Sequence, residues 1–83
     1  MHETHIIAPI IQGIAAHAQR AGAQKVLKIR LRIGELSGIK EESFKATFAI
    51  LATGTPLEDA ELEISFFPST HVEVLSFDID YID

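Results

Sequence analysis

The chain has 83 residues, no cysteine and a formal net charge of −5, which together exclude several classes of protein. This length supports one domain with a single modest core, and a hydrophobic content of 47% is ample to pack it. Seven basic residues against twelve acidic ones argue against nucleic-acid binding, and the lack of cysteine excludes disulfides, thiolate zinc sites and a cysteine nucleophile. No apolar run is long enough to span a membrane and no signal peptide is evident, so we expect a cytoplasmic protein.

The first three residues, Met1-His2-Glu3, combine the groups of a chelating site for a metal ion. A free N-terminal amine, the next amide nitrogen and the His2 imidazole can close two adjoining chelate rings around one ion. Nitrogen-rich, planar sets of this kind suit Ni(II) or Cu(II) better than Zn or Mg. The alternative is a solvated histidine that follows an ordinary initiator methionine.

Apolar residues then recur with the i, i+3, i+4 spacing of an amphipathic helix. They are Ile6, Ile7, Ile10, Ile11, Ile14, Ala15 and Ala18. Gly22 is the expected stop. Pro9 lies inside the pattern, where it removes one backbone hydrogen bond and disfavours helical geometry at Ala8. Either the regular helix starts near Ala8, or it begins near Glu3 and bends.

The segment 26–33 changes to a period of two, which is typical of a strand with one buried side and one side in solvent. The buried side is expected to hold Leu27, Ile29, Leu31 and Ile33, and the other side Lys28, Arg30 and Arg32. The stretch 34–38 turns the chain, because its two glycines can take positive φ. A second helix is expected over about 42–52, with Phe44, Phe48 and Leu51 buried.

Two more strands complete the predicted fold. The first covers Glu61–Phe67, with Leu62, Ile64 and Phe66 facing inward, and Pro68 ends it. The last covers about 72–82, with Leu75, Phe77, Ile79 and Tyr81 facing inward. The order α-β-α-β-β predicts an α+β fold over residues 1–83, in which two helices pack on one face of a three-stranded sheet.

The order of the strands in this sheet stays open. The short link between the last two strands favours a hairpin. The charges on the solvent side favour a different order, because the first strand is basic there and the other two carry Glu61, Glu63, Asp78 and Asp80. Opposite charges across a ladder stabilise a sheet by about 0.2 to 1 kcal/mol per pair, which a basic strand between two acidic ones would satisfy.

Five stretches along nearly the whole chain carry a family resemblance. They are Met1-His2-Glu3, Ala21-Gly22-Ala23 to Val26, Ile33-Gly34-Glu35-Leu36-Ser37-Gly38-Ile39, Leu51 to Gly54-Thr55, and Ala60-Glu61-Leu62-Glu63-Ile64. In this order they resemble the HypA/HybF family of nickel metallochaperones. The N-terminal Met-His-Glu and the Gly-Glu-Leu-Ser-Gly stretch are the specific parts of the match.

The resemblance implies a HypA-like nickel-binding domain that serves maturation of a [NiFe]-hydrogenase or related nickel enzyme. It implies a GTPase partner of the HypB type and the hydrogenase precursor. The family's nickel site falls here on His2 and Glu3, with the Met1 amine and backbone amides as further donors. His5 lies three residues after His2, so on a helical turn the two imidazoles can face one ion; the alternative is an exposed histidine.

The main departure from the family is the missing zinc domain, which in relatives lies between the last two strands. Here only Pro68-Ser69-Thr70-His71 stands in that place, and no structural zinc is expected. Either this is a natural short paralogue, or the zinc domain has been excised by design. The alternative function is a metal-free interaction module that keeps the fold and partner surface. A link this short also favours strand exchange in a homodimer.

The remaining candidate ligands are weaker. We expect His17 on the polar helix face and His71 in the link to be solvated, and Glu35 to be a loop carboxylate. The chain has no phosphate-binding glycine loop and no nucleophile motif, so we expect no enzymatic activity.

Overall fold

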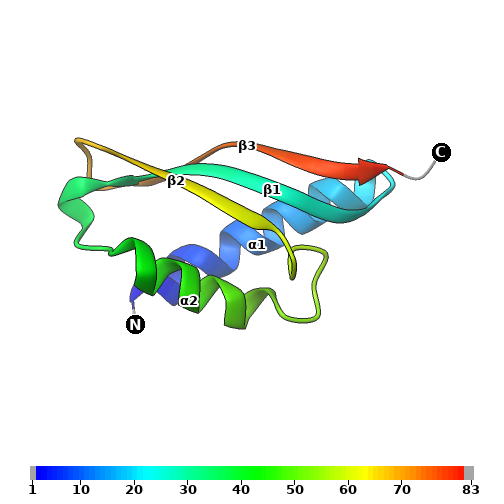
Figure 1. Cartoon of the computed structure of the whole chain (residues 1–83), viewed down its shortest axis with the longest axis horizontal. Helices are drawn as coiled ribbons and strands as arrows, with labels where there is room; N and C mark the ends of the chain where they lie inside the picture. Colours follow the sequence, from blue (N-terminus) through cyan, green and yellow to red (C-terminus); the bar gives the residue numbers. More distant parts are fainter. Residues whose placement is uncertain (1, 82–83) are drawn as a thin grey trace.

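The computed structural model describes residues 2–81 and, among them, the side chains of residues 3–80. Its elements are helix α1 (His2–Arg20), strand β1 (Ala23–Gly34), the 3-10 helix η1 (Glu35–Ser37), helix α2 (Glu41–Ala52), strand β2 (Glu61–Phe67) and strand β3 (Val72–Tyr81). Both helices lie on one face of the sheet (Figure 1). The predicted α+β class and the α-β-α-β-β order are therefore confirmed.

Helix α1 begins at His2 and continues through Pro9 to Arg20, so the earlier of the two expected starts is the observed one. Because Pro9 has no N–H, the carbonyl of His5 lacks its usual helical donor. The apolar stripe of Ile7, Ile11 and Ile14 is buried against the sheet, which stabilises the helix despite this loss. No helix within residues 2–81 is long and apolar enough to cross a membrane.

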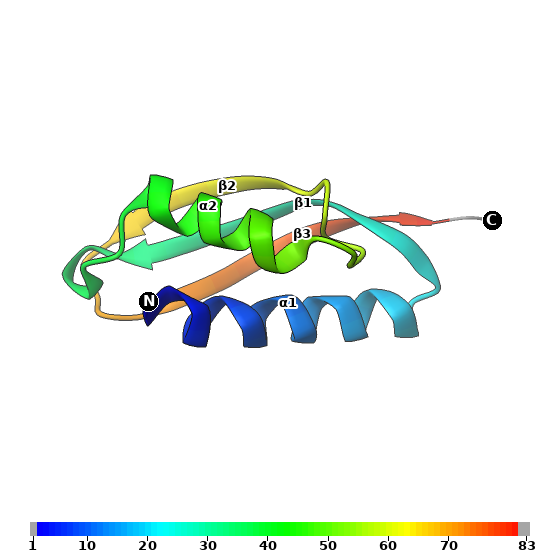
Figure 2. The same cartoon turned by 90° about the horizontal axis from the view of Figure 1, so that it is seen from below.

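The sheet has the order β2-β1-β3, so the expected hairpin between β2 and β3 is wrong. Strand β1 lies between them, parallel to β2 and antiparallel to β3. The parallel pair is joined through α2, the kind of crossover that parallel strands need. Figure 2 shows β1 running between the other two strands. The basic strand is thus flanked by two acidic ones, as the charges on the solvent side had favoured.

The short link can skip β1 because it crosses the end of that strand. The Gly34 amide donates to the His71 carbonyl at 2.7 Å, and the Leu36 amide donates to the Ser69 carbonyl at 3.0 Å. Gly34 has an ordinary negative φ of −66°, but a Cβ at this position would collide with the Ser69 carbonyl oxygen. Glycine is therefore required here by the close approach of two backbones, and positive φ is needed instead at Gly38, where φ is 81°.

The predicted burial of two residues is wrong, because the pairing between β1 and β3 is irregular. Leu27 and Leu75 were expected inside but are 50% and 55% exposed, and both lie at shifts in the β1–β3 register. An extra residue at a bulge reverses the alternation of a strand. Val26 and Ile29 are therefore both buried, although they are separated by an odd number of positions.

The core lies between the helices and β1. Its fully buried large side chains are Phe44, Ile7, Ile29, Leu31, Ile33, Leu57 and Val26. Leu62, Ile64, Phe77 and Ile79 from the outer strands pack against this cluster and are partly buried. Phe66, also expected inside, is 44% exposed at the sheet edge. The central strand thus supplies most of the sheet's contribution to the core.

The other face of the sheet is a ladder of ion pairs centred on β1. Lys28 pairs with Glu63 on β2 at 2.9 Å. Arg30 donates to both carboxylate oxygens of Asp78 on β3, at 3.0 and 2.9 Å. Arg32 pairs with Glu73 on β3, and its guanidinium lies 3.9 Å from the centre of the Phe67 ring on β2. Lys28, Arg30 and Arg32 are therefore each matched by a carboxylate on a neighbouring strand.

This ladder predicts an acid-sensitive contribution to stability. Hydrogen bonding from the Arg30 guanidinium lowers the pKa of Asp78 below its ordinary value of 3.8. A carboxyl with a lowered pKa in the folded state stabilises the fold at pH values above its unfolded pKa, and this contribution is lost as pH falls through the folded pKa. We therefore expect Asp78→Asn to flatten the decline in unfolding free energy below about pH 4.

Urea titrations at several pH values would measure this effect. Asp59→Asn, in the exposed loop before β2, is the matched control. It should leave the acid limb of the stability profile unchanged. Identical profiles for the native protein and Asp78→Asn would contradict a role for the Arg30–Asp78 pair.

Candidate functional site

The four predicted metal ligands fall at the start of α1, and the structure describes them unequally. Met1 lies outside the described residues. For His2 the structure gives the backbone position alone, as the first residue of the helix. The side chain of Glu3 is half-buried and that of His5 is exposed. The backbone thus brings His2, Glu3 and His5 into the first turns of one helix.

The start of a helix provides backbone donors for a metal site. The first four N–H groups of an α-helix have no partner within the helix. The amide nitrogens of His2 and Glu3 are among these, so coordination of a metal by them would break no helical hydrogen bond. The exposed His5 side chain follows His2 by three residues, the spacing at which side chains on a helix are neighbours.

Glu3 connects this helix end to the start of α2. The Ser43 hydroxyl donates a hydrogen bond of 3.0 Å to a carboxylate oxygen of Glu3 across a sequence separation of 40 residues. The first turn of α1 is therefore attached, through Glu3, to the first turn of α2. Ser43 was not predicted, because no sequence pattern marks a contact between residues so far apart.

The other candidate ligands do not form a second site. His17 is exposed and makes a T-shaped contact with the Phe77 ring, with the ring centres 5.4 Å apart. His71 is exposed in the link, and Glu35 is exposed in η1. The described part of the chain contains no group of three or more His, Asp or Glu side chains placed to hold a metal.

Comparison with known proteins identifies the family. A family model described as "Hydrogenase/urease nickel incorporation, metallochaperone, hypA" matches residues 1–72. The chain belongs to the HypA family. That description is of a metallochaperone, not an enzyme, and the match runs from the N-terminus through β2 and the link to the first residue of β3.

Individual HypA relatives agree with this assignment. The chain is 41% identical over 70 residues to the hydrogenase maturation factor HypA of Chloroflexus aggregans, an alignment that covers 84% of this chain and 61% of that protein. It is 38% identical over 64 residues to HypA of Methanopyrus kandleri, covering 77% and 45%. The chain thus spans less than two thirds of the length of these relatives.

The fold is that of a solved HypA structure. The solution structure of the Ni metallochaperone HypA from Helicobacter pylori superposes with a TM-score of 0.82, over 96% of this chain and 98% of that one. The two sequences are only 16% identical, so this likeness concerns the fold alone. A second solution structure of a HypA protein gives a TM-score of 0.80.

Proposed function

We propose that this protein carries Ni(II) at its N-terminus for the maturation of a [NiFe]-hydrogenase or related nickel enzyme. The observation that supports this most is that the match to a nickel-incorporation family begins at residue 1 and includes Met1-His2-Glu3. Met1 supplies its amine, His2 its imidazole, and Glu3 an amide nitrogen or its carboxylate. This donor set suits a four-coordinate, roughly planar Ni(II). His5 is an additional candidate ligand.

A site on the first turn of a helix also suits a carrier, which must release its ion. Helix ends open at a small free-energy cost compared with the core. The neighbouring Thr4 and His5 are exposed, so a receiving protein can approach the ion directly.

We propose a HypB-type GTPase and the hydrogenase precursor as partners, and the cytoplasm as the compartment. The relatives, which are named hydrogenase maturation factors, support a role beside other maturation proteins. A homodimer and the absence of structural zinc also belong to this proposal. The missing cysteines support the last point, since a structural zinc site in this family is held by thiolates.

Titration of Ni(II) into protein whose first residue is Met1 tests the proposed function. We expect saturable binding of one ion at micromolar or tighter affinity, and tighter binding of Cu(II), which precedes nickel in the affinity order of divalent metals. A protein that binds no nickel below millimolar concentrations would instead be a metal-free interaction module.

Removal of the Ser43 hydroxyl should weaken this site modestly. Partners that orient metal ligands from outside typically change metal affinity by about 10- to 100-fold, and this bond is exposed, so Ser43→Ala should weaken nickel binding by about tenfold or less. Ser43→Thr keeps the hydroxyl and should restore the affinity. Calorimetry would measure both variants, and equal weakening by alanine and threonine would contradict a role for the Ser43–Glu3 bond.

A further inference from the structure

We propose that the groove between β2 and α2 binds an extended, basic and apolar segment of a partner protein, which adds to the sheet as a fourth strand. None of the residues that line this groove is a proposed metal ligand, and the inference is independent of nickel binding. It is supported by the open edge of β2, by two apolar hollows beside that edge, and by the charges around them.

Strand β2 is an edge that can accept another strand. Within residues 2–81 its only neighbour in the sheet is β1. Its pairing with β1 runs from Glu61 to Phe67 without a register shift, and it contains no proline and no lysine. Bulges, prolines and lysines are the usual devices that protect an edge strand from pairing. Strand β3, at the other edge, has three register shifts. The regularly paired edge, without bulge, proline or lysine, is therefore that of β2.

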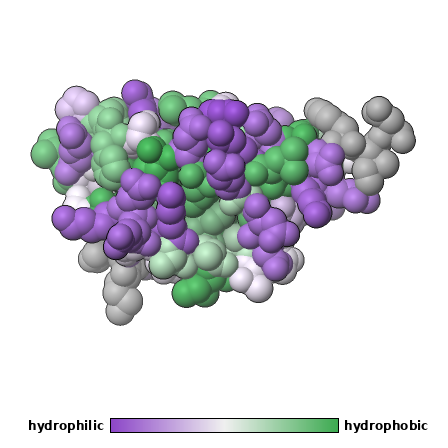
Figure 3. Space-filling view, viewed as in Figure 1, coloured by the Kyte–Doolittle hydropathy of each residue, from purple (hydrophilic) through white to green (hydrophobic). Residues whose placement is uncertain are grey.

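Helix α2 forms the second wall, and two hollows lie between it and β2. One hollow, of about 410 Å³, is lined by Phe66, Ile39 and the start of α2 at Glu41. The other, of about 220 Å³, is lined by Leu62 with Phe48 and Ala49 of α2. Figure 3 shows apolar surface exposed in this region between polar side chains. An added strand would therefore meet an apolar hollow at each end of β2.

The spacing of the hollows matches an extended chain. Leu62 and Phe66 are four residues apart on β2, which corresponds to about 13 Å of strand. Side chains at i and i+4 of a paired strand lie on one face at the same separation. Strand addition of this kind takes affinity from main-chain hydrogen bonds and specificity from pockets for alternate side chains, as in PDZ domains. A partner segment with apolar residues at i and i+4 fits both hollows.

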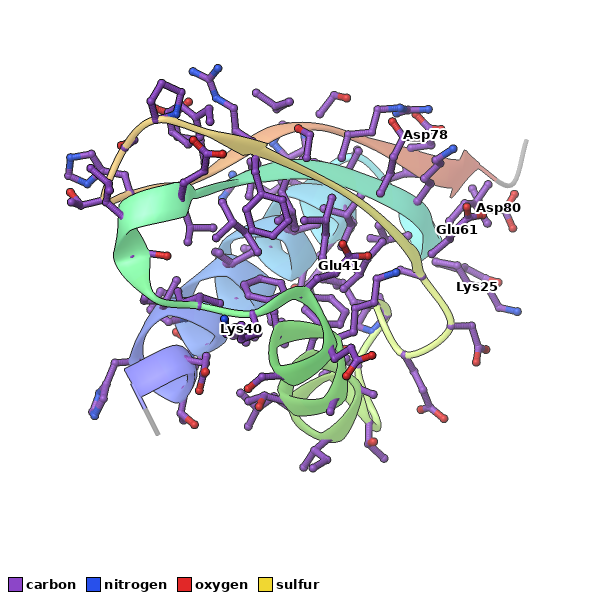
Figure 4. The ribbon with its side chains drawn as sticks, turned by 60° about the vertical axis from the view of Figure 1, so that its left-hand side comes forward. Lys25, Lys40, Glu41, Glu61, Asp78 and Asp80 are labelled. Atoms are coloured by element: carbon purple, nitrogen blue, oxygen red, sulfur yellow. The ribbon has the colours of Figure 1, made fainter. Side chains whose placement is uncertain are left out.

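The charges around the groove favour a basic partner. Glu35, Glu41, Glu58 and Glu61 line the hollows together with Lys40 and Lys45. Lys45 is already paired with Glu41 at 3.1 Å. Figure 4 shows Glu41 between α2 and β2, and Glu61 at the start of β2. A second copy of this chain would bring two acidic rims together, which disfavours self-pairing through this edge.

The test uses a synthetic peptide, acetyl-Lys-Leu-Thr-Val-Thr-Leu-Lys-amide, with a fluorophore, and measures its binding by anisotropy. Ala49→Trp places a bulky ring in the groove and should weaken binding at least about tenfold. Ala46→Trp is the matched control, because Ala46 is also exposed on α2 but does not line either hollow. It should leave binding unchanged, and circular dichroism of both variants should match that of the native protein.

Two further peptides test strand addition and charge. Successive N–H groups of a strand point to opposite edges, so N-methylation of one alternate set should abolish binding and N-methylation of the other should not. Replacing both lysines by glutamate should weaken binding. The proposal would be overturned by no binding at millimolar peptide, by equal effects of the two tryptophan variants, or by a protein dimer that Ala49→Trp alone dissociates. None of these outcomes depends on nickel.

Discussion

Replacing Phe44 by alanine should lower the free energy of unfolding by about 3 to 5 kcal/mol. Phe44 is fully buried on the inner face of α2 and stacks on Phe48, with ring centres 6.5 Å apart. Its removal costs the hydrophobic transfer of the ring and leaves a cavity between α2 and the sheet. Because small domains have total stabilities of about 5 to 15 kcal/mol, this loss is a large share of the total stability.

Urea unfolding followed by circular dichroism would measure this loss, and Phe66→Ala is the matched control. Phe66 is the same residue type but is 44% exposed at the sheet edge. Its truncation should cost less than about half as much, since large losses come mainly from cavities in the core. Similar losses for the two variants would show that the core does not lie between α2 and β1.

Replacing His2 by alanine should weaken nickel binding by more than about 100-fold. The imidazole is a proposed direct ligand, and loss of a direct ligand should exceed the roughly 10- to 100-fold effect of losing a partner outside the first coordination sphere. The reason is that the six-membered chelate ring, closed by the imidazole, is lost together with the ligand. Calorimetric titration of the native protein and the variant would measure the difference.

His17→Ala is the matched control for this experiment. It also removes an exposed imidazole from α1, but in the last turn of the helix, against Phe77. It should leave nickel affinity unchanged. Equal weakening by the two substitutions would mean that nickel is bound by surface histidines in general and not by the N-terminal chelate. His5→Ala, measured beside them, would decide whether His5 contributes a ligand.

The periodicity of the chain predicted the elements well but not all of their pairings. Strand β2 was predicted with its observed bounds, and α2 within one residue. The hairpin was wrong because link length was taken to imply adjacency, whereas the backbone of the link crosses the end of β1 at Gly34. The charges predicted the strand order better than the link length did, because opposite charges such as those of Arg30 and Asp78 favour neighbouring strands.

Predictions of buried residues failed where the strands are irregular. Strict alternation placed Leu27 and Leu75 inside, but a bulge adds one residue and reverses the alternation beyond it. The position of a bulge depends on the pairing of two strands, so neither strand alone reveals it. Glu73 and Asp78 show the consequence: five positions apart, they both reach the basic residues of β1.

The proposed ligands could be named from the sequence alone, but the surroundings of the site could not. Met1, His2 and Glu3 are adjacent in sequence, so their proximity needs no fold. The contact between Glu3 and Ser43 and the groove beside β2 each join segments that are distant in sequence. They become visible only after α1, α2 and β2 have been placed around β1.

Acetylation of the N-terminal amine tests whether this amine is a nickel ligand. It leaves every side chain in place and removes only the charge and the donor capacity of the amine on Met1. We predict that the unmodified protein binds one Ni(II) with the spectrum of a planar, diamagnetic ion, and that the acetylated protein loses both the affinity and this spectrum. Equal affinity and the same spectrum for the two proteins would contradict a nickel site at the N-terminus.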